Sequence, residues 1–222
     1  MSIFKLTVLI FSLLGCGNKS QEVDILSSDK NNDNLSITNK NLEGLSVAYF
    51  ASGCFWCVEA VFESVIGVEE AVSGYSGGKA EDATYEKVSA GITEHAEAIA
   101  VYYNPVFVKY ETLLTVFFDS HDPTTLNRQG PDAGYQYRSA IFYQNETERQ
   151  LAEQKIAQIN DSKIYTNPVV TQIVPFDAFY PAEEYHQNYE KRNPNNGYVR
   201  NVSIPRLKKF QSKHPDLLKE KQ

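Results

Sequence analysis

Cysteine is scarce in this 222-residue chain, which has only Cys16, Cys54 and Cys57. A secreted scaffold held together by disulfides needs more cysteines, spread more widely, so the composition excludes that class of protein. Cys16 lies in an N-terminal segment with its own explanation, given below. The remaining close pair is typical of a redox-active or metal-binding site and not of a structural disulfide.

Positive charge is also in short supply, with 21 Lys and Arg residues against 28 Asp and Glu, a net charge of −7. Binding to a phosphate backbone depends on clustered positive charge, so nucleic acid is excluded as a partner. The hydrophobic content of 42% and aromatic content of 12% are typical of a folded protein. The length suffices for one domain with a sizeable core.

Hydrophobic runs long enough to span a bilayer are lacking. The apolar run at 6–14 has the length of a signal-peptide core and follows a single positive charge at Lys5. Its end, Leu13-Leu14-Gly15-Cys16, resembles the lipobox of bacterial lipoproteins. The resemblance implies cleavage before Cys16 and diacylation of that cysteine. The alternatives are an ordinary signal peptide with a chance cysteine, or a buried N-terminal helix.

We therefore expect three segments. Residues 1–15 form the signal peptide, and residues 16–44 carry the acylated cysteine and a polar tether rich in Asn, Ser, Lys and Asp. Residues 45–222 form the folded domain, which ends in a basic tail outside the motifs described below. The expected location is the bacterial cell envelope, with the domain lipid-anchored to a membrane and facing the periplasm or the exterior.

Apolar periodicity within the domain predicts interleaved strands and helices. Several strands lack a crossover helix, which favours an α+β fold over a doubly wound parallel sheet. We expect a two-layer sandwich with a mixed, mostly antiparallel sheet, a ferredoxin-like plait core and long functional loops. Strands are predicted at 47–51, 68–75, 97–103, 139–143 and 169–174, helices after Gly53 and at 84–89, 110–118, 147–159 and 181–189, and a long loop at 122–136.

The pentapeptide 53–57, Gly-Cys-Phe-Trp-Cys, lies where the first strand gives way to a helix. Unpaired N–H groups and the helix dipole favour an anion in the first helical turn. A lowered pKa is therefore predicted for the Cys54 thiol. Cys57 follows three residues later on the same face, where α-carbons lie roughly 5–6 Å apart, within disulfide range.

Further motifs follow the cysteine pair along the chain: Gly53-Cys54-Phe55-Trp56, Gly74-Tyr75-Ser76-Gly77-Gly78, Thr84-Tyr85, Gly91 with His95-Ala96-Glu97-Ala98, His121-Asp122-Pro123, Arg128-Gln129-Gly130, Asp132, Gln136-Tyr137-Arg138-Ser139 and His186-Gln187-Asn188-Tyr189. In this order, over residues 47–203, they closely resemble the A-type peptide methionine sulfoxide reductases. The resemblance implies thiol-dependent reduction of the S epimer of methionine sulfoxide, free or in proteins, and thus repair of oxidised proteins. It also implies no bound cofactor or metal and reduction by an external thiol such as a thioredoxin-like protein. No oligomer signal is visible, so we expect a monomer.

The resemblance assigns chemical roles to three kinds of residue. Cys54 matches the nucleophile that attacks the sulfoxide sulfur. Glu97 matches an acid that must be protonated, which requires an apolar site that raises its pKa. Tyr85 and Tyr137 match phenols that donate hydrogen bonds to the sulfoxide oxygen, where negative charge develops. Taken singly, Glu97 could be an exposed strand residue, and the two tyrosines are among fourteen.

Substrate-binding residues follow in the same way. Phe55 and Trp56 match the apolar wall that holds the S-methyl group, although an isolated aromatic pair is more often part of a core. Asp132 matches a carboxylate that anchors the substrate backbone or helps to place the cysteines. Its alternative, purely structural role is that of a turn residue. His95, His121 and His186 match family positions, and we assign them structural hydrogen bonding instead of a chemical step.

The chain departs from the common family pattern around the second thiol. Val199 stands where many members carry a resolving cysteine, whereas Cys57 stands where those members often have glycine; Pro131 replaces the usual asparagine. Cys57 is therefore the hypothetical partner that condenses with a sulfenic acid on Cys54. The rival is direct reduction of the sulfenic acid by an external thiol, with Cys57 as a small buried filler.

Three other classes of function stay open at this point. A thioredoxin-like disulfide oxidoreductase also uses a C-x-x-C pair at a helix start, but it does not require the Glu97 and Tyr137 motifs. A metal site built from Cys54, Cys57, His95 and His121 is possible on ligand type. The third class is a lipid-anchored domain that binds oxidised peptides without turnover.

Overall fold

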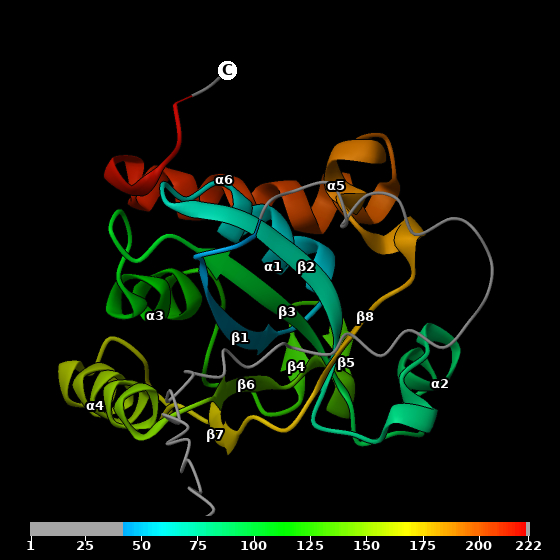
Figure 1. Ribbon diagram of the computed structural model, residues 1–222, viewed down its shortest axis with the longest axis horizontal. Coiled ribbons are helices and arrows are strands. Elements are labelled where there is room, and N and C mark those ends of the chain that lie inside the picture. Colours follow the sequence, from blue (N-terminus) through cyan, green and yellow to red (C-terminus); the bar gives the residue numbers. More distant parts are fainter. Residues whose placement is uncertain (1–41, 221–222) are drawn as a thin grey trace, which may run out of the picture. The chain divides into compact units, whose positions relative to one another are not determined.

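A six-stranded sheet organises the part of the chain that the computed structural model describes, residues 42–220 (Figure 1). The predicted signal peptide, the lipidation of Cys16 and nearly all of the predicted tether lie outside these residues. The strands are β1 (Ser46–Ser52), β2 (Val68–Ser76), β3 (Ala96–Tyr103), β6 (Ser139–Tyr143), β7 (Gln172–Pro175) and β8 (Phe179–Pro181). Within the described residues, no helix is long and apolar enough to cross a membrane.

The strand order across the sheet is β7-β6-β1-β3-β2-β8. The β6–β7 pair is parallel and the other neighbours are antiparallel. The inner order β6-β1-β3-β2 is that of a ferredoxin-like plait, with one helix after β1 and another after β3. The predicted α+β fold with a mixed, mostly antiparallel sheet is confirmed.

Six α-helices accompany the sheet in the described residues: α1 (Phe55–Glu63), α2 (Tyr85–Ser89), α3 (Tyr110–Asp119), α4 (Glu146–Ser162), α5 (Tyr189–Arg192) and α6 (Ile204–Lys213). A π-helical segment, Val199–Ser203, leads directly into α6. The helix α1 packs against β1, β2 and β3 and also against α5 and α6. The C-terminal segment therefore lies beside the helix that carries both cysteines (Figure 1).

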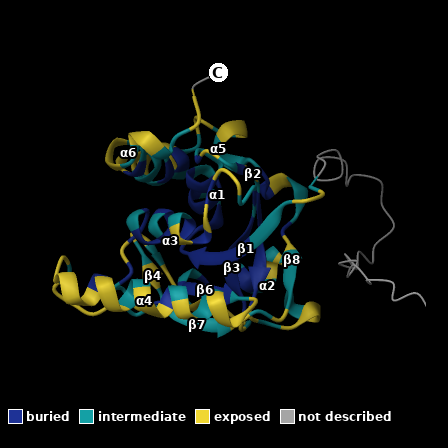
Figure 2. Cartoon of the chain, turned by 60° about the vertical axis from the view of Figure 1, so that its left-hand side comes forward, coloured by how far each residue is buried: buried dark blue, intermediate teal, exposed yellow. Residues whose placement is uncertain are grey.

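Alternation along the strands divides the core between the two faces of the sheet. On β3, Ile99 and Val101 join the core formed with α1 and α3, while Ala98 and Ala100 face the opposite side. Figure 2 shows the sheet and the inner sides of α1 and α3 buried, and the outer sides of α4 and α6 exposed. Because Glu97 is two residues before Ile99, the period of two places it on the face that α1 covers.

The predictions for the 169–189 region were partly wrong. The strand expected at 169–174 begins only at Gln172, and the helix expected at 181–189 does not form. Instead Pro181 ends β8 at the sheet edge, a short 3₁₀ turn covers Glu184–His186, and Asn188 takes a left-handed conformation with φ of 53° before α5. The side chain of Gln187 bonds backbone groups of Ser73 and Ala182, so tertiary contacts outweigh the local apolar pattern.

The expected loop at 122–136 is irregular but contains a small hairpin. Its two strands are β4 (Arg128–Gln129) and β5 (Asp132–Ala133), followed by a 3₁₀ turn over Tyr135–Tyr137. The hairpin brings Gln129 against Gly53, and the turn presents Tyr137. This loop therefore contributes directly to the surroundings of the cysteine pair.

Candidate active site

The junction between β1 and α1 is built around a glycine. Gly53 has a φ of +86°, and a Cβ added there would lie 2.5 Å from the Cβ of Gln129, so only glycine fits. Cys54 follows as the N-cap of α1, and its carbonyl accepts the N–H of Cys57 at 3.2 Å and of Val58 at 3.4 Å. Both cysteine side chains are buried and unoxidised.

Glu97 is held against this helix start. Its Oε2 accepts the backbone N–H of Phe55 at 3.1 Å, and only 2% of the residue is exposed. Burial raises the pKa of Glu97 to about 8, with the nearby Asp132 and Cys57 adding to the rise. The carboxyl is therefore protonated at neutral pH, which is the state that an acid catalyst needs.

The lowered pKa predicted for Cys54 is wrong for the substrate-free site. Burial, the neighbouring Cys57 and the charge of Glu97 together hold the pKa of Cys54 well above its usual value. The first N–H of the helix, that of Phe55, is bonded to Glu97, and the Cys54 side chain makes no capping hydrogen bond. The helix start therefore stabilises the carboxyl group instead of the thiolate.

Cys57 has the opposite electrostatic environment. A hydrogen bond with the Cys54 thiol and the charge of Arg206 together lower the pKa of Cys57 to about 6 against the effect of burial. Of the two thiols, Cys57 is therefore the one that ionises more readily.

Two phenols face the same space. Tyr85 begins α2 and Tyr137 ends the 3₁₀ turn after the hairpin, and both are half-buried. Burial raises the pKa of each phenol, and the charges of Glu97 and Cys54 add to this in both cases. Both hydroxyls therefore keep their protons, and both lie within electrostatic reach of the acid and the nucleophile.

An aromatic cluster forms one side of the site. The Trp56 indole stacks on Tyr189 with ring centroids 3.7 Å apart, and its N–H donates to Nδ1 of His186 at 3.1 Å. The Phe55 ring lies 5.1 Å from the His186 ring and is fully buried, whereas Trp56 is partly exposed. Burial lowers the pKa of His186 to about 4, so it accepts as a neutral ring.

Asp132 is joined to the cysteines through a tyrosine that sequence reasoning had not singled out. Tyr198 donates its hydroxyl proton to Oδ2 of Asp132 at 2.5 Å, and the Tyr198 hydroxyl oxygen lies 3.7 Å from Sγ of Cys57. This contact agrees with the second role suggested for Asp132, placement of the cysteines. The sequence did draw attention to this region, because Tyr198 directly precedes Val199, where the chain departs from the family pattern that it resembles.

Two further charged residues near the site were missed. Glu183 accepts the Tyr75 hydroxyl at 2.8 Å and the backbone N–H of Tyr85 at 3.0 Å, so it fixes the start of α2. Arg206, in the tail considered to lie outside the motifs, donates to Ser52 directly before Gly53. No local pattern marks either residue, since their partners lie about 100 residues or more away in sequence.

The other histidines bond within the scaffold. His95 contacts the Lys79 carbonyl at 2.9 Å, and His121 contacts the Phe117 carbonyl at 2.7 Å and the Ser139 hydroxyl at 2.9 Å. In residues 42–220, no three His, Cys, Asp or Glu side chains are grouped to hold a metal ion. Neither histidine is directed to the cysteine pair as the metal alternative would require.

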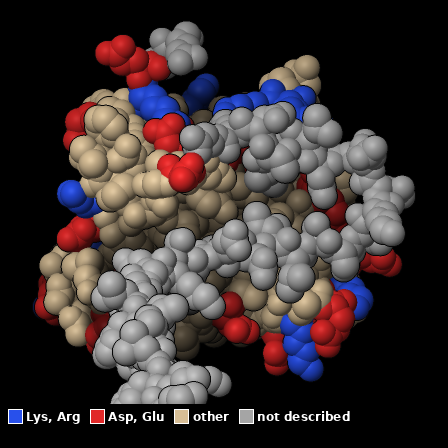
Figure 3. All heavy atoms as spheres, viewed as in Figure 1, with Lys and Arg blue, Asp and Glu red and all other residues tan. Residues whose placement is uncertain are grey.

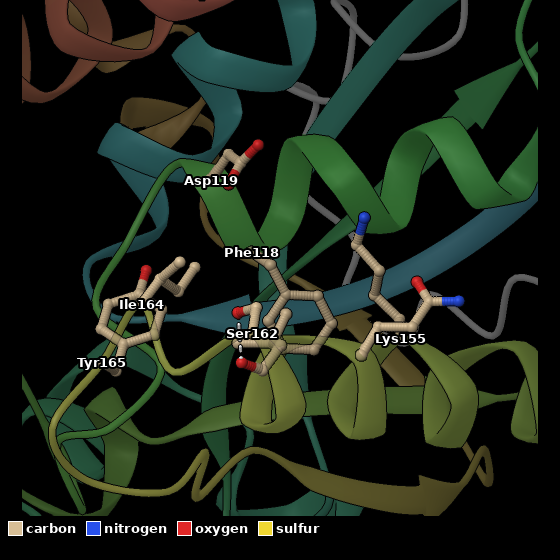
Figure 4. A pocket seen from close by; sticks show the side chains of 8 residues that line it. Phe118, Asp119, Lys155, Ser162, Ile164 and Tyr165 are labelled. Atoms are coloured by element: carbon tan, nitrogen blue, oxygen red, sulfur yellow. Dashed lines mark hydrogen bonds between the residues drawn. The ribbon is translucent and has the colours of Figure 1, made fainter.

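A separate hollow of about 250 Å³ lies between α3 and α4 (Figure 4). Phe118 and Asp119 contribute from α3, and Lys155 and Ser162 from α4. It shares no residue with the site described above, so it does not hold the predicted chemistry. The predicted residues Cys54, Cys57, Phe55, Trp56, Tyr85, Glu97, Asp132 and Tyr137 are instead brought together at the start of α1.

Comparison with known proteins places this arrangement in a sequence family. The family profile described as peptide methionine sulfoxide reductase matches residues 46–218. Peptide methionine sulfoxide reductase MsrA 1 of Rhodopirellula baltica is 48% identical over 180 residues, covering 81% of this chain and 93% of the relative. The corresponding MsrA of Acinetobacter baumannii is 49% identical over 173 residues, covering 78% and 98%.

Solved structures agree in fold. Mxr1 of Saccharomyces cerevisiae in its reduced form superposes with a TM-score of 0.65 at 33% identity, covering 69% of this chain and 88% of the other. Methionine sulfoxide reductase A of Corynebacterium diphtheriae gives a TM-score of 0.61 at 31% identity, covering 69% and 77%.

Proposed function

This chain belongs to the peptide methionine sulfoxide reductase family, and from that premise we propose how its residues divide the reaction between them. The protein is an oxidoreductase that reduces methionine sulfoxide to methionine. We propose that it acts on the S epimer, free or in proteins, and so repairs oxidised proteins. The observation that carries the mechanism is the buried, protonated Glu97, bonded to the helix start that holds Cys54.

The first step transfers the oxygen to the enzyme. The S-methyl group lies against Phe55 and Trp56, and the sulfoxide oxygen points to Glu97 and the two phenols. The Cys54 sulfur bonds to the sulfoxide sulfur while Glu97 protonates the oxygen. The bonds from the substrate sulfur to this oxygen and to Cys54 then break, and the oxygen passes to Cys54 as a hydroxyl group. The substrate sulfur gains two electrons, the Cys54 sulfur loses two, and the proton lost by the Cys54 thiol returns Glu97 to its acid form.

The second step removes the sulfenic acid. The Cys57 thiolate attacks the Cys54 sulfur, the S–O bond breaks, and the hydroxide takes a proton and leaves as water. The position of Cys57 three residues after Cys54, within disulfide range, and the lowered pKa of Cys57 support this assignment. An external dithiol of the thioredoxin-like class then reduces the Cys54–Cys57 disulfide by thiol–disulfide exchange. No cofactor is needed in this cycle, and we propose that the protein acts as a monomer.

Stereochemistry provides the test of the first step. Peptides that contain the S or the R epimer of methionine sulfoxide are assayed in parallel, with a Cys54→Ser variant as control. We expect turnover of the S epimer by the parent protein and none by the variant. Activity on the R epimer alone, or equal activity in the variant, would contradict the proposal.

The mass of the protein tests the second step. After one equivalent of substrate without reductant, the parent should be lighter by two hydrogen atoms, and Cys57→Ser should retain the sulfenic oxygen. Turnover of Cys57→Ser at the parental rate with a thioredoxin would favour the rival, direct reduction of Cys54 by the external thiol.

We also propose, from the motif Leu13-Leu14-Gly15-Cys16, that cleavage after residue 15 leaves a diacylated Cys16 and a polar tether at 16–44 before the domain at 45–222. The chain would then be held at a bacterial envelope membrane, facing the periplasm or exterior. Incorporation of labelled fatty acid by the parent and its loss in Cys16→Ser are the expected results. Equal labelling of both would contradict the proposal.

A further inference from the structure

Arg206 differs from the other cations of the C-terminal segment. Figure 3 shows Lys and Arg along the upper edge of the molecule, over α5 and α6, where Lys208 and Lys209 are exposed. Arg206, on the same helix α6, is partly buried and turns toward the end of β1. Arg206 is therefore a partly buried charge beside the end of β1 and not a solvated surface charge.

Three hydrogen bonds hold the guanidinium group in place. Nη1 donates to the Ser52 carbonyl and Nη2 to the Ser52 hydroxyl, each at 3.0 Å, and Nε donates to the Ser120 carbonyl at 2.6 Å. Ser52 is the last residue of β1, two positions before Cys54. The planar fork of an arginine fixes such an arrangement better than a lysine amine would.

The positive charge of Arg206 is not neutralised by an ion pair. All three of its acceptors are uncharged oxygens, and no carboxylate of residues 42–220 lies within ion-pair distance of the guanidinium. The charge instead acts on the site: it helps to lower the pKa of Cys57, adds to the effect of burial in lowering that of His121, and opposes the rise that burial causes in the pKa of Asp132. A partly buried charge of this kind is screened less by solvent than a surface charge.

The hydroxyl groups near Cys57 cannot replace that charge. A hydroxyl carries one proton to donate, and that of Tyr198 is given to Asp132. The Ser203 hydroxyl donates to Glu190 in the same way. Once Cys54 has become a sulfenic acid, its thiol proton is gone too. Arg206 is then the group that favours the thiolate of Cys57 in the second step.

We infer that Arg206 is a positioning residue for the resolving step: its guanidinium joins α6 to the end of β1, holds the cysteine segment in place and presents a positive charge to Cys57. This role rests on the proposed function of Cys57 as the resolving thiol. It gives the basic C-terminal helix a part in the reaction, although the helix contributes no atom that reacts. Arg206 acts through Cys57 and Ser52 and does not touch the substrate.

The test follows both steps in one turnover of the full-length protein. Reduced enzyme is mixed with one equivalent of an S-sulfoxide peptide without reductant, and methionine formation reports the first step. Loss of the sulfenic acid, trapped with dimedone at timed intervals, reports the second. The variants are Arg206→Met, Arg206→Lys and Arg206→Gln, with Lys208→Met as the matched change on the exposed side of the same helix.

At a pH below the pKa of Cys57, Arg206→Met should slow the loss of sulfenic acid by about tenfold for each unit by which that pKa rises. Methionine formation should fall much less, and Lys208→Met should match the parent in both steps. Arg206→Lys, which retains the charge, should lie closer to the parent than Arg206→Gln, which retains only hydrogen bonding. Equal rates of resolution in Arg206→Met and the parent, or the reverse order of the Lys and Gln variants, would overturn the inference.

A pH profile separates the electrostatic role from a merely structural one. The groups around Cys57 are Cys54 on its own helix, Glu97 from β3, Asp132 from β5, Tyr198 and Ser203 before α6, and Arg206 itself. Loss of Arg206 should move the midpoint of the resolving rate to higher pH, and an unchanged midpoint would overturn the charge role. Cys57→Ser separates a failure of the proposed function from a failure of this inference. If Cys57→Ser loses its sulfenic acid as fast as the parent does, the proposed function of Cys57 fails. If Cys57→Ser is blocked while the Arg206 variants resolve at the parental rate, only the role of Arg206 fails.

Discussion

Cys54 and Cys57 are three residues apart in sequence, yet the pKa values of their thiols are shifted in opposite directions. Cys54 faces a buried acid and two phenols, and its pKa is raised; Cys57 faces Arg206, and its pKa is lowered to about 6. The difference arises because α1 packs between β3 on one side and the C-terminal segment on another. The two thiols thus suit two different steps, oxygen transfer at Cys54 and thiolate attack by Cys57.

The largest effect should follow from loss of the acid. Glu97→Gln retains the bond to the Phe55 N–H but cannot donate an acidic proton, so the first step should slow by about 10²–10⁴-fold. Single-turnover formation of methionine measures this rate. The exposed Glu86→Gln is the control and should behave as the parent; a parental rate in Glu97→Gln would remove the acid from the mechanism.

A smaller loss is expected from the phenols. Tyr85→Phe and Tyr137→Phe each remove one hydrogen bond to an oxygen that becomes charged, a loss of about 1.5–3 kcal/mol, or roughly ten- to a hundredfold in rate. The first step should slow, while loss of the sulfenic acid should be unaffected. If loss of the sulfenic acid slowed by the same factor, the phenols would act in both steps and not in the first step alone.

The junction that places Cys54 should be sensitive to one added carbon. Gly53→Ala adds a Cβ at 2.5 Å from Gln129 to a residue with φ of +86°, whereas Gly44→Ala has φ of +80° and no atom within 4 Å. Backbone strain alone should cost about 1 kcal/mol in each variant. The clash should make Gly53→Ala the less stable of the two in urea unfolding, and equal losses would show that Gln129 gives way freely.

The smallest changes are those with pH, and they should have opposite signs for the two steps. The first step needs protonated Glu97, so its rate should fall about tenfold per unit above pH 8. The second step needs ionised Cys57, so its rate should fall at pH values below the pKa of that thiol. Measurement of both rates from pH 5 to 9 would show two separate limits, and parallel profiles would contradict the division between the cysteines.

The stability of the protein should also change with pH because of Glu97. The pKa of Glu97 is raised on folding, so between about 4.5 and 8 the native state binds more protons than the unfolded state. Stability therefore falls as pH rises through this window and does not depend on Glu97 below it. In urea unfolding, Glu97→Gln should remove the part of the pH dependence of the unfolding free energy that comes from Glu97. An identical pH dependence in both proteins would show that another group binds the proton.

Regular elements and the order of motifs could be predicted from the sequence because they depend on local patterns. The strands at 47–51, 97–103 and 139–143 and the helix at 110–118 follow directly from apolar periodicity, and the structure confirms them. The region at 181–189 could not be predicted in this way. Its backbone is held by the side chain of its own Gln187 and by that of Glu59 in α1.

The sequence by itself determined the chemistry available at the site: two thiols at helical spacing, a glutamate on the inward face of a strand, and the tyrosines of the ordered motifs. Only the tertiary structure decided how that chemistry is distributed. The Phe55 N–H that was expected to stabilise a Cys54 thiolate is bonded to Glu97, and Arg206, 152 positions further along the chain than Cys54, supplies its charge to Cys57. A pKa depends on burial and on charges within a few ångströms, and those neighbours are set by packing and not by position in the chain.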